Sequence, residues 1–275
     1  MVKMTGEGLS RRKVLAGAGV LATGAFLGRL SGGIADATMD VEYFGPVTAE
    51  VGKIRMEKWP WPYVKLDPAE TAERAYHTWY RLYCGGAVIG SIFGQLAEKV
   101  GEPYKSFPCD AFIYMEGGIT EWGTICGSNN GANLVTNLII GPRTTDTEDG
   151  ALMGTEIMQW YSDALMPVYV PKKPMITTAI PRTISHSPLC HISVGRWMKA
   201  SKKPMNSPER KHRCASVSAS VAYHLVELLN QWKDGKYVTK GTVGVQVYNI
   251  SAQPDCEDCH GSNVPIPPAP LKKTT

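Results

Sequence analysis

Three residues near the C-terminus have the types and the spacing that covalent haem attachment requires. Cys256 and Cys259 are separated by two residues, and His260 follows directly. In such a motif the two thiols form thioether bonds with the vinyl groups of one haem, and the histidine supplies the proximal nitrogen to the iron. A disulfide and a zinc site are the alternatives, but a zinc site needs a second pair of ligands at similar spacing. A thioredoxin-type redox pair would open a helix, whereas Gly261 and several prolines follow here. We therefore predict a c-type haem.

Five further cysteines precede this motif, an odd number that a complete disulfide framework would not use up. Most of them are expected at helix ends, next to glycines or at a helix start, where a thiolate is electrostatically favoured. Cys214 lies on the apolar stripe of a long helix and is expected to face inward. Two interpretations stay open: four of these thiols converge on an iron–sulfur cluster, or they are buried free thiols or form one or two disulfides. The five are Cys84, Cys109, Cys126, Cys190 and Cys214.

A second, incomplete attachment motif involves one of these cysteines. Cys190 and His191 have the spacing of the C-terminal motif, but Ser187 stands where the first cysteine would be. Cys190 could hold a second haem by a single thioether, with His191 as the proximal ligand. It could equally be a ligand of the cluster, and the sequence leaves both roles open.

The other histidines are candidate sixth ligands of haem iron, with a methionine as the alternative. His224 lies on the apolar stripe of the long helix and His77 in the middle of a helix, so each is either a hydrogen-bonded core residue or a ligand. His186 is close to Cys190 in the sequence. His212 lies in a run of basic residues, which favours a solvated position.

The elements that position these residues are mainly helices. Asp67 can cap a helix that runs to about residue 83 and restarts after a break at 84–86. Further helices are expected at about 129–140, at 150–165, at 189–201, and from Ser207 to about Trp232. The fold class is therefore mainly α: an irregular helical domain with Gly/Pro-rich loops. We expect a helical Cys-rich redox domain at 38–235 and a largely irregular haem-attachment segment at 236–275.

The N-terminal residues 1–37 are typical of a twin-arginine signal peptide. Arg11 and Arg12 precede a short apolar run, and an uncleaved anchor is the alternative. Removing this segment lowers the formal net charge from +4 by three, to +1, which together with the absence of a basic stripe argues against nucleic-acid binding. No other stretch has the ~18 apolar residues of a membrane span. Because this export route carries folded proteins, it fits a periplasmic protein that receives a cofactor before export.

Four segments carry a resemblance to a known family: "YCGGAVIGSIFGQL", "GGITEWGTICGSNNGANL", "LCHISVGRW" and "RCASVSASVAYHLVELLNQW". They resemble the redox-active proteins known by the pattern C-GCAxxG-C-C, although this chain has Gly85-Gly86 where the pattern has Gly-Cys. With the signal peptide and the C-terminal motif, the chain is similar to the split-Soret cytochromes c. That resemblance implies a helical homodimer with two stacked bis-histidine haems in each subunit, and it is compatible with an iron–sulfur centre.

Three classes of function follow from these features. The first is a periplasmic electron-transfer cytochrome, with other redox proteins as partners, and the spare histidines favour it. The second is a haem and iron–sulfur oxidoreductase acting on a small molecule, but no acid–base constellation stands out. The third is a binding module held by disulfides or zinc, which the haem-attachment motif disfavours.

Overall fold

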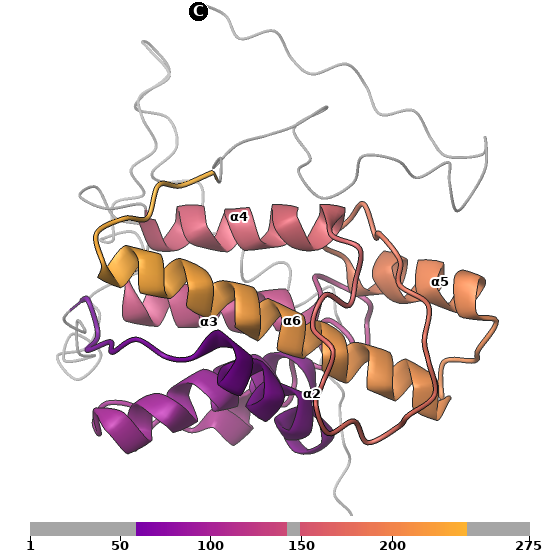
Figure 1. The fold of residues 1–275 in the computed structure, drawn as a ribbon, viewed down its shortest axis with the longest axis horizontal. Coiled ribbons are helices and arrows are strands. Elements are labelled where there is room, and N and C mark those ends of the chain that lie inside the picture. Colours follow the sequence, from indigo (N-terminus) through magenta and orange to yellow (C-terminus); the bar gives the residue numbers. More distant parts are fainter. Residues whose placement is uncertain (1–58, 142–148, 241–275) are drawn as a thin grey trace, which may run out of the picture. The chain divides into compact units, whose positions relative to one another are not determined.

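The computed structural model describes residues 59–141 and 149–240, and it confirms a mainly α fold (Figure 1). The predicted signal peptide and the haem-attachment residues Cys256, Cys259 and His260 lie outside the described residues. Within the described ranges, β structure is confined to two isolated antiparallel bridges, Ile125 with Leu189 and Met166 with Thr183. The helices are α2 (Pro68–Lys99), the short 3-10 helix η2 (Cys109–Phe112), α3 (Gly127–Ile139), α4 (Asp149–Asp163), α5 (Cys190–Ser201) and α6 (Pro208–Lys233).

Local capping chemistry explains where the two longest helices begin. At the start of α2, the Asp67 side chain accepts a hydrogen bond of 2.8 Å from the Glu70 amide. At the start of α6, Ser207 accepts one of 3.2 Å from the Arg210 amide. Each cap is followed by a proline at the first turn, where its missing N–H costs nothing. Both predicted helix starts are confirmed.

The expected break in the first helix is a kink inside α2. Tyr83 has φ 54° and ψ −159°, a backbone conformation that non-glycine residues rarely adopt, while the helix continues on both sides. The kink changes the direction of the chain immediately before Cys84. It therefore sets where that thiol points.

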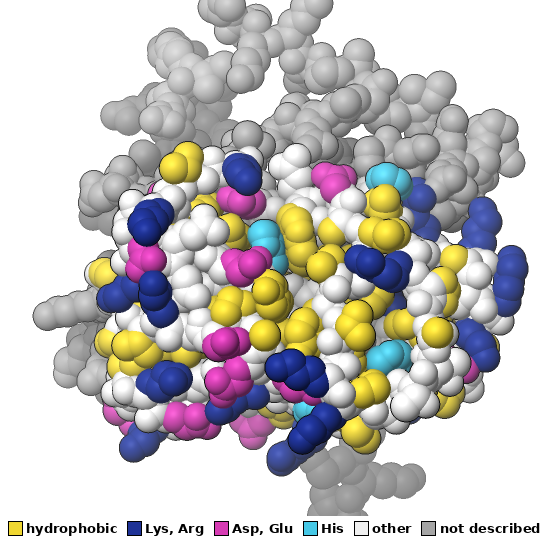
Figure 2. All heavy atoms as spheres, in the orientation of Figure 1, with side chains coloured by type: hydrophobic (Ala, Val, Ile, Leu, Met, Phe, Trp, Pro, Cys, Tyr) yellow, Lys and Arg dark blue, Asp and Glu magenta, His cyan; other side chains and the backbone are white. Residues whose placement is uncertain are grey.

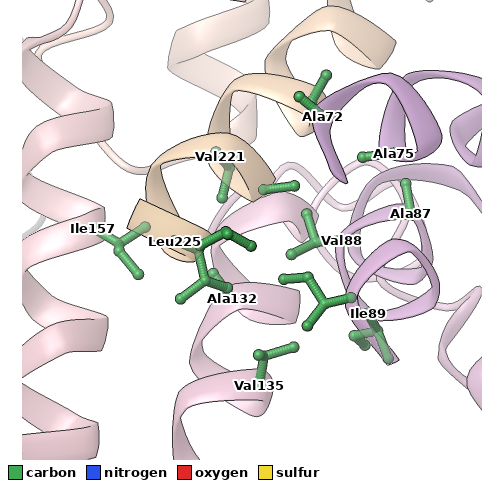
Figure 3. Close-up of a cluster of buried hydrophobic side chains, with 14 of the residues drawn as sticks. Ala72, Ala75, Ala87, Val88, Ile89, Ala132, Val135, Ile157, Val221 and Leu225 are labelled. Carbon is green, nitrogen blue, oxygen red and sulfur yellow. The ribbon is translucent and has the colours of Figure 1, made fainter. Parts of the chain in front are cut away.

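Four helices form layers around one hydrophobic core. α2 packs against α6 and α3, and α4 packs against α3 and α6 from the other side; Figure 1 shows these layers one above another. Val88 of α2, Ala132 of α3 and Leu225 of α6 are fully buried and point toward one another (Figure 3). This core is what fixes the relative positions of the helix ends.

Glycines let α2 and α3 approach each other closely. A Cβ atom on Gly131 would lie 2.6 Å from the carbonyl oxygen of Gly85, a distance that real Cβ atoms do not show. The Gly85 amide also donates a hydrogen bond of 3.3 Å to the Met115 carbonyl, in the loop before α3. Because only glycine allows this contact, the first turns of α3 lie directly against the kink of α2.

The surface of the described part combines charges of both signs. Figure 2 shows acidic and basic side chains interspersed with hydrophobic ones on the face that it draws. Among residues 59–141 and 149–240, no helix combines the length and the hydropathy that crossing a bilayer would demand.

Candidate functional site

Four cysteines lie at points where helices begin, bend or pack. Cys84 directly follows the kink of α2, Cys126 is the N-cap residue of α3, Cys190 is the first residue of α5, and Cys214 lies in the second turn of α6. Their exposed fractions are only 6%, 5%, 8% and 7%. We call these four residues the cysteine group.

Two antiparallel backbone segments bring Cys126 and Cys190 together. The Cys126 amide donates a hydrogen bond of 2.8 Å to the Pro188 carbonyl, and the Cys190 amide donates one of 2.7 Å to the Thr124 carbonyl. Ile125 and Leu189 form the bridge between these bonds. The starts of α3 and α5 are thereby held side by side.

The other two thiols reach the same place through the packing of α3. A Cβ atom on Gly127, next to Cys126, would lie 2.9 Å from the Cβ of Cys84. The hydroxyls of Ser128 and Ser218 are hydrogen-bonded at 2.8 Å, and Ser218, one turn after Cys214, also donates to the Cys214 carbonyl. The first turn of α3 therefore touches both α2 and α6 at their cysteines.

Burial raises the pKa of the Cys84 thiol, and the charges of Cys126 and Cys214 nearby raise it further. Burial likewise raises the pKa of the Cys190 thiol, and the other three thiols of the cysteine group raise it further. All four cysteines are free, not disulfide-bonded. With their raised pKa values, the thiols of Cys84 and Cys190 are neutral, and a metal ion would have to displace their protons.

Cys109, the fifth cysteine of the described part, is separate from the cysteine group. It is half-buried in η2, and burial raises the pKa of its thiol to about 11, with Asp110 as the next contribution and none from the other thiols. It offers a matched control for substitutions within the cysteine group.

Within residues 59–141 and 149–240, no three Cys, His, Asp or Glu side chains are arranged to hold a single metal ion. The four sulfurs are thus neighbours without forming the compact shell of a zinc-type site. A cluster places several irons and bridging sulfides between its thiolates, so its ligands lie farther apart than those of one ion. The donor set of four thiols fits an iron–sulfur cluster.

Three polar residues that the sequence analysis did not single out line the cysteine group. Arg213 is 1% exposed, and its Nη1 lies 3.9 Å from the Cys214 sulfur. Its Nη2 donates to the Ser193 hydroxyl at 2.6 Å, and Tyr161 donates to the same hydroxyl at 2.7 Å. The basic run that contains Arg213 indicated a solvated surface, and this was wrong: His212 is buried too, at 7% exposure.

The chain matches, over residues 84–228, the family described as "Putative redox-active protein (C_GCAxxG_C_C)". It belongs to the C_GCAxxG_C_C family. It is also 32% identical over 256 residues to the split-Soret cytochrome c of Desulfovibrio desulfuricans, covering 92% of this chain and 87% of that protein. A solved structure that reports a novel iron centre in that cytochrome is similar as well. Its TM-score is 0.61 at 33% identity, covering 74% of this chain and 82% of that one.

The matched range begins at Cys84 and includes Gly85-Gly86, where the sequence analysis expects a departure from the Gly-Cys pair of this C_GCAxxG_C_C family. That departure stays a prediction. A Cβ at Gly86 would lie 2.8 Å from the Cβ of Leu82 and 4.0 Å from the Cys109 carbonyl oxygen. That position faces Leu82 and η2. The thiol of Cys84, two residues earlier, is the one that lies in the cysteine group.

The histidines of this family member lie in different surroundings. His224 is partly buried; its ring stacks on Trp160 at 4.2 Å, and its Nδ1 lies 3.4 Å from a Glu227 carboxylate oxygen. His77 is exposed and lies 3.3 Å from Glu73. His186 and His191 are also exposed.

Cys190 and His191 are adjacent in sequence, but the thiol of Cys190 is buried in the cysteine group whereas the His191 side chain is exposed.

Proposed function

We propose that this protein is a periplasmic electron carrier of the split-Soret cytochrome type, with a covalently bound haem and an iron–sulfur centre. The observation that carries the proposal is the cysteine group, in which four buried free thiols meet from four different elements. Four cysteine thiols from separate helices are the donor set that holds an iron–sulfur cluster. The iron centre reported for the relative in Desulfovibrio desulfuricans supports the same assignment.

The iron–sulfur centre would be held by Cys84, Cys126, Cys190 and Cys214. When bound, such a centre supplies one-electron redox chemistry. The chain provides the four sulfurs and excludes water from them. It also provides the indole N–H of Trp79, which lies 3.3 Å from the Cys84 sulfur and can donate to it. Hydrogen bonds to cluster sulfurs and burial are the protein's means of setting the reduction potential.

Cys256, Cys259 and His260 would attach the haem, as the relative's description as a cytochrome c supports. The sixth ligand we favour is His224. Tyr237 and the Lys240 amide both bond to Glu156, at 2.9 and 3.0 Å, and the charges of Glu156 and Lys240 act on His224. Lys240, at the end of the described range 149–240, thus lies near His224. The exposed His77, His186 and His191 are accessible to a haem of the same chain or of a second copy, which fits a homodimer with stacked haems.

The test is a count of haem and non-haem iron per chain in protein made with a periplasmic haem-attachment system. Wild type should contain covalent haem by pyridine haemochrome and additional acid-labile iron. C84S and C126S should each lose the non-haem iron and keep the haem. The double variant C256S/C259S should lose the covalent haem and keep the non-haem iron. C109S, outside the cysteine group, should retain both. Wild-type protein without non-haem iron would refute the assignment of the cysteine group, and protein without covalent haem would refute the cytochrome.

A further inference from the structure

We propose that Arg213 is the resident counter-charge of the iron centre and raises its reduction potential. The inference rests on the proposed function, because it concerns the same cysteine group. Arg213 would act through the charge on Cys214 and is therefore a positioning residue.

The first observation is a buried cation with an incomplete set of partners. Arg213 is 1% exposed, and its Nε has no hydrogen-bond partner. Its Nη2 donates to the hydroxyl and the carbonyl of Ser193, at 2.6 and 3.4 Å, and its Nη1 faces the Cys214 sulfur at 3.9 Å. Both hydrogen-bond partners on Ser193 are uncharged groups.

The second observation concerns the opposite charge with which a buried arginine is usually paired. The ion pairs formed between residues of the described part join other side chains and do not include Arg213. A buried charge without an opposite charge is strongly unfavourable, so folded proteins rarely keep one. Burial disfavours the charged form and tends to lower the pKa of the Arg213 guanidinium, whereas the groups near enough to act against this are Cys214, Tyr161 and Cys126. An anion in the cysteine group would therefore compensate Arg213.

An iron–sulfur cluster bound by four thiolates is such an anion, because the thiolates carry more negative charge than the core carries positive charge. A second path leads from Arg213 to the cluster: Ser193 accepts from both Arg213 and Tyr161, at 2.6 and 2.7 Å. Burial raises the pKa of the Tyr161 hydroxyl, and the adjacent Cys126 thiol raises it further. Arg213, Ser193 and Tyr161 thus connect Cys214 with Cys126 along one side of the cysteine group.

The consequence is electrostatic. Adding an electron makes the centre more negative, so a fixed cation beside its thiolates stabilises the reduced form more than the oxidised form. Removing Arg213 should therefore lower the reduction potential. It should also weaken the retention of iron, since the thiolates would lose their counter-charge.

The experiment compares R213Q and R213K with R210Q in the full chain. Arg210 is a matched control because its Nη1 lies 4.0 Å from the same sulfur. Unlike Arg213 it is only half-buried, its Nε donates to the Met205 carbonyl at 2.7 Å, and its charge acts on the Glu116 carboxylate. Redox titration followed by the electron paramagnetic resonance of the iron centre should give a lower midpoint potential for R213Q than for wild type. R213K and R210Q should stay close to wild type.

Urea unfolding supplies a readout that a merely structural role would not produce. Without metal, R213Q should be at least as stable as wild type, because a buried cation with no anion is removed. With iron bound, R213Q should be less stable and release iron faster. Equal destabilisation of both forms, or an unchanged potential, would overturn the role of Arg213 while leaving the iron centre intact. Wild-type protein that binds no non-haem iron would overturn the proposed function itself, and this inference with it.

Discussion

An alanine at position 131 would test whether the close contact of α2 and α3 holds the cysteine group in place. A methyl group at Gly131 would lie 2.6, 2.9 and 3.1 Å from the carbonyl oxygen, Cα and carbonyl carbon of Gly85. All three are backbone atoms, so no rotamer change can relieve the clash. The two helices would have to move apart, and with them Cys84 and Cys126, which adjoin the contact.

The magnitude follows from two opposing effects. Overpacking a tight interior costs about 1–3 kcal/mol, whereas replacing glycine by alanine inside a helix adds about 0.5–1 kcal/mol of stability. An alanine at Gly94 of α2 separates overpacking from helix propensity, because a Cβ atom there would meet nothing within 4 Å. G94A gains the helix propensity without the clash. G131A should therefore be about 1–3 kcal/mol less stable than G94A, or about 2–12 °C in Tm for a chain of this size.

The assay is thermal and urea unfolding of both variants, followed by far-UV circular dichroism, with non-haem iron per chain as a second measurement. G131A should melt below wild type and retain less iron, and G94A should melt at or above wild type with its iron unchanged. If G131A were as stable as G94A, the glycine contact would not be tight in solution. If G131A were less stable but kept its iron, the contact would not position the thiols.

Three other perturbations give distinct expectations. N230A should cost about 1–3 kcal/mol in urea unfolding, because the Asn230 side chain accepts hydrogen bonds from the Tyr63 hydroxyl and the Leu66 amide and donates one to the Leu66 carbonyl. An unchanged midpoint would mean that these bonds do not stabilise the packing of Tyr63 and Leu66 on α6. Burial tends to raise the pKa of Glu73, but hydrogen bonds, chiefly from backbone amides, bring it below the ordinary 4.5. The ionised Glu73 carboxylate therefore contributes its full stabilisation of the fold above pH 4.5. This contribution is lost as the pH falls through the pKa of Glu73 in the folded protein. Acid unfolding of E73Q should show a smaller loss in that range than wild type, and parallel curves would contradict this. H224A should convert a six-coordinate haem to one that binds carbon monoxide rapidly, and a spectrum identical to that of wild type would exclude His224 as the sixth ligand.

Helix boundaries could be predicted from the sequence wherever local chemistry decides them. Asp67 and Ser207 each precede a proline and an acidic residue, and both cap helices as the pattern indicates. The break near Cys84 was predicted for the same reason, although the strained residue is Tyr83. The start of α3 was placed about two residues too late, because Cys126 caps that helix without a side-chain hydrogen bond and so leaves no polar signal.

The surroundings of the cysteine group could not be predicted, because they depend on packing between distant segments. The run of basic residues before Cys214 suggested that His212 is solvated. In the fold, α6 turns Arg213 and His212 inward, where His212 bonds to the Tyr76 hydroxyl at 2.8 Å. Charge alone does not reveal burial, since a long basic side chain is stable inside only where the fold supplies a partner. Cys214 itself was assigned correctly to the inner face, because the apolar period of the helix around it is local information.

The choice between haem and cluster for Cys190 shows what helix geometry adds to a motif. Successive residues of a helix project about 100° apart, so the first two residues of α5 can face different surroundings. Cys190 points into the cysteine group, and His191 is exposed. A haem held by this pair would need both side chains on the same ring. We therefore expect C190S to lose non-haem iron and to keep the full wild-type haem count, and H191A to retain its iron. A drop in covalent haem in C190S, measured by pyridine haemochrome, would instead make this residue the second attachment site and leave the iron centre with three thiolates.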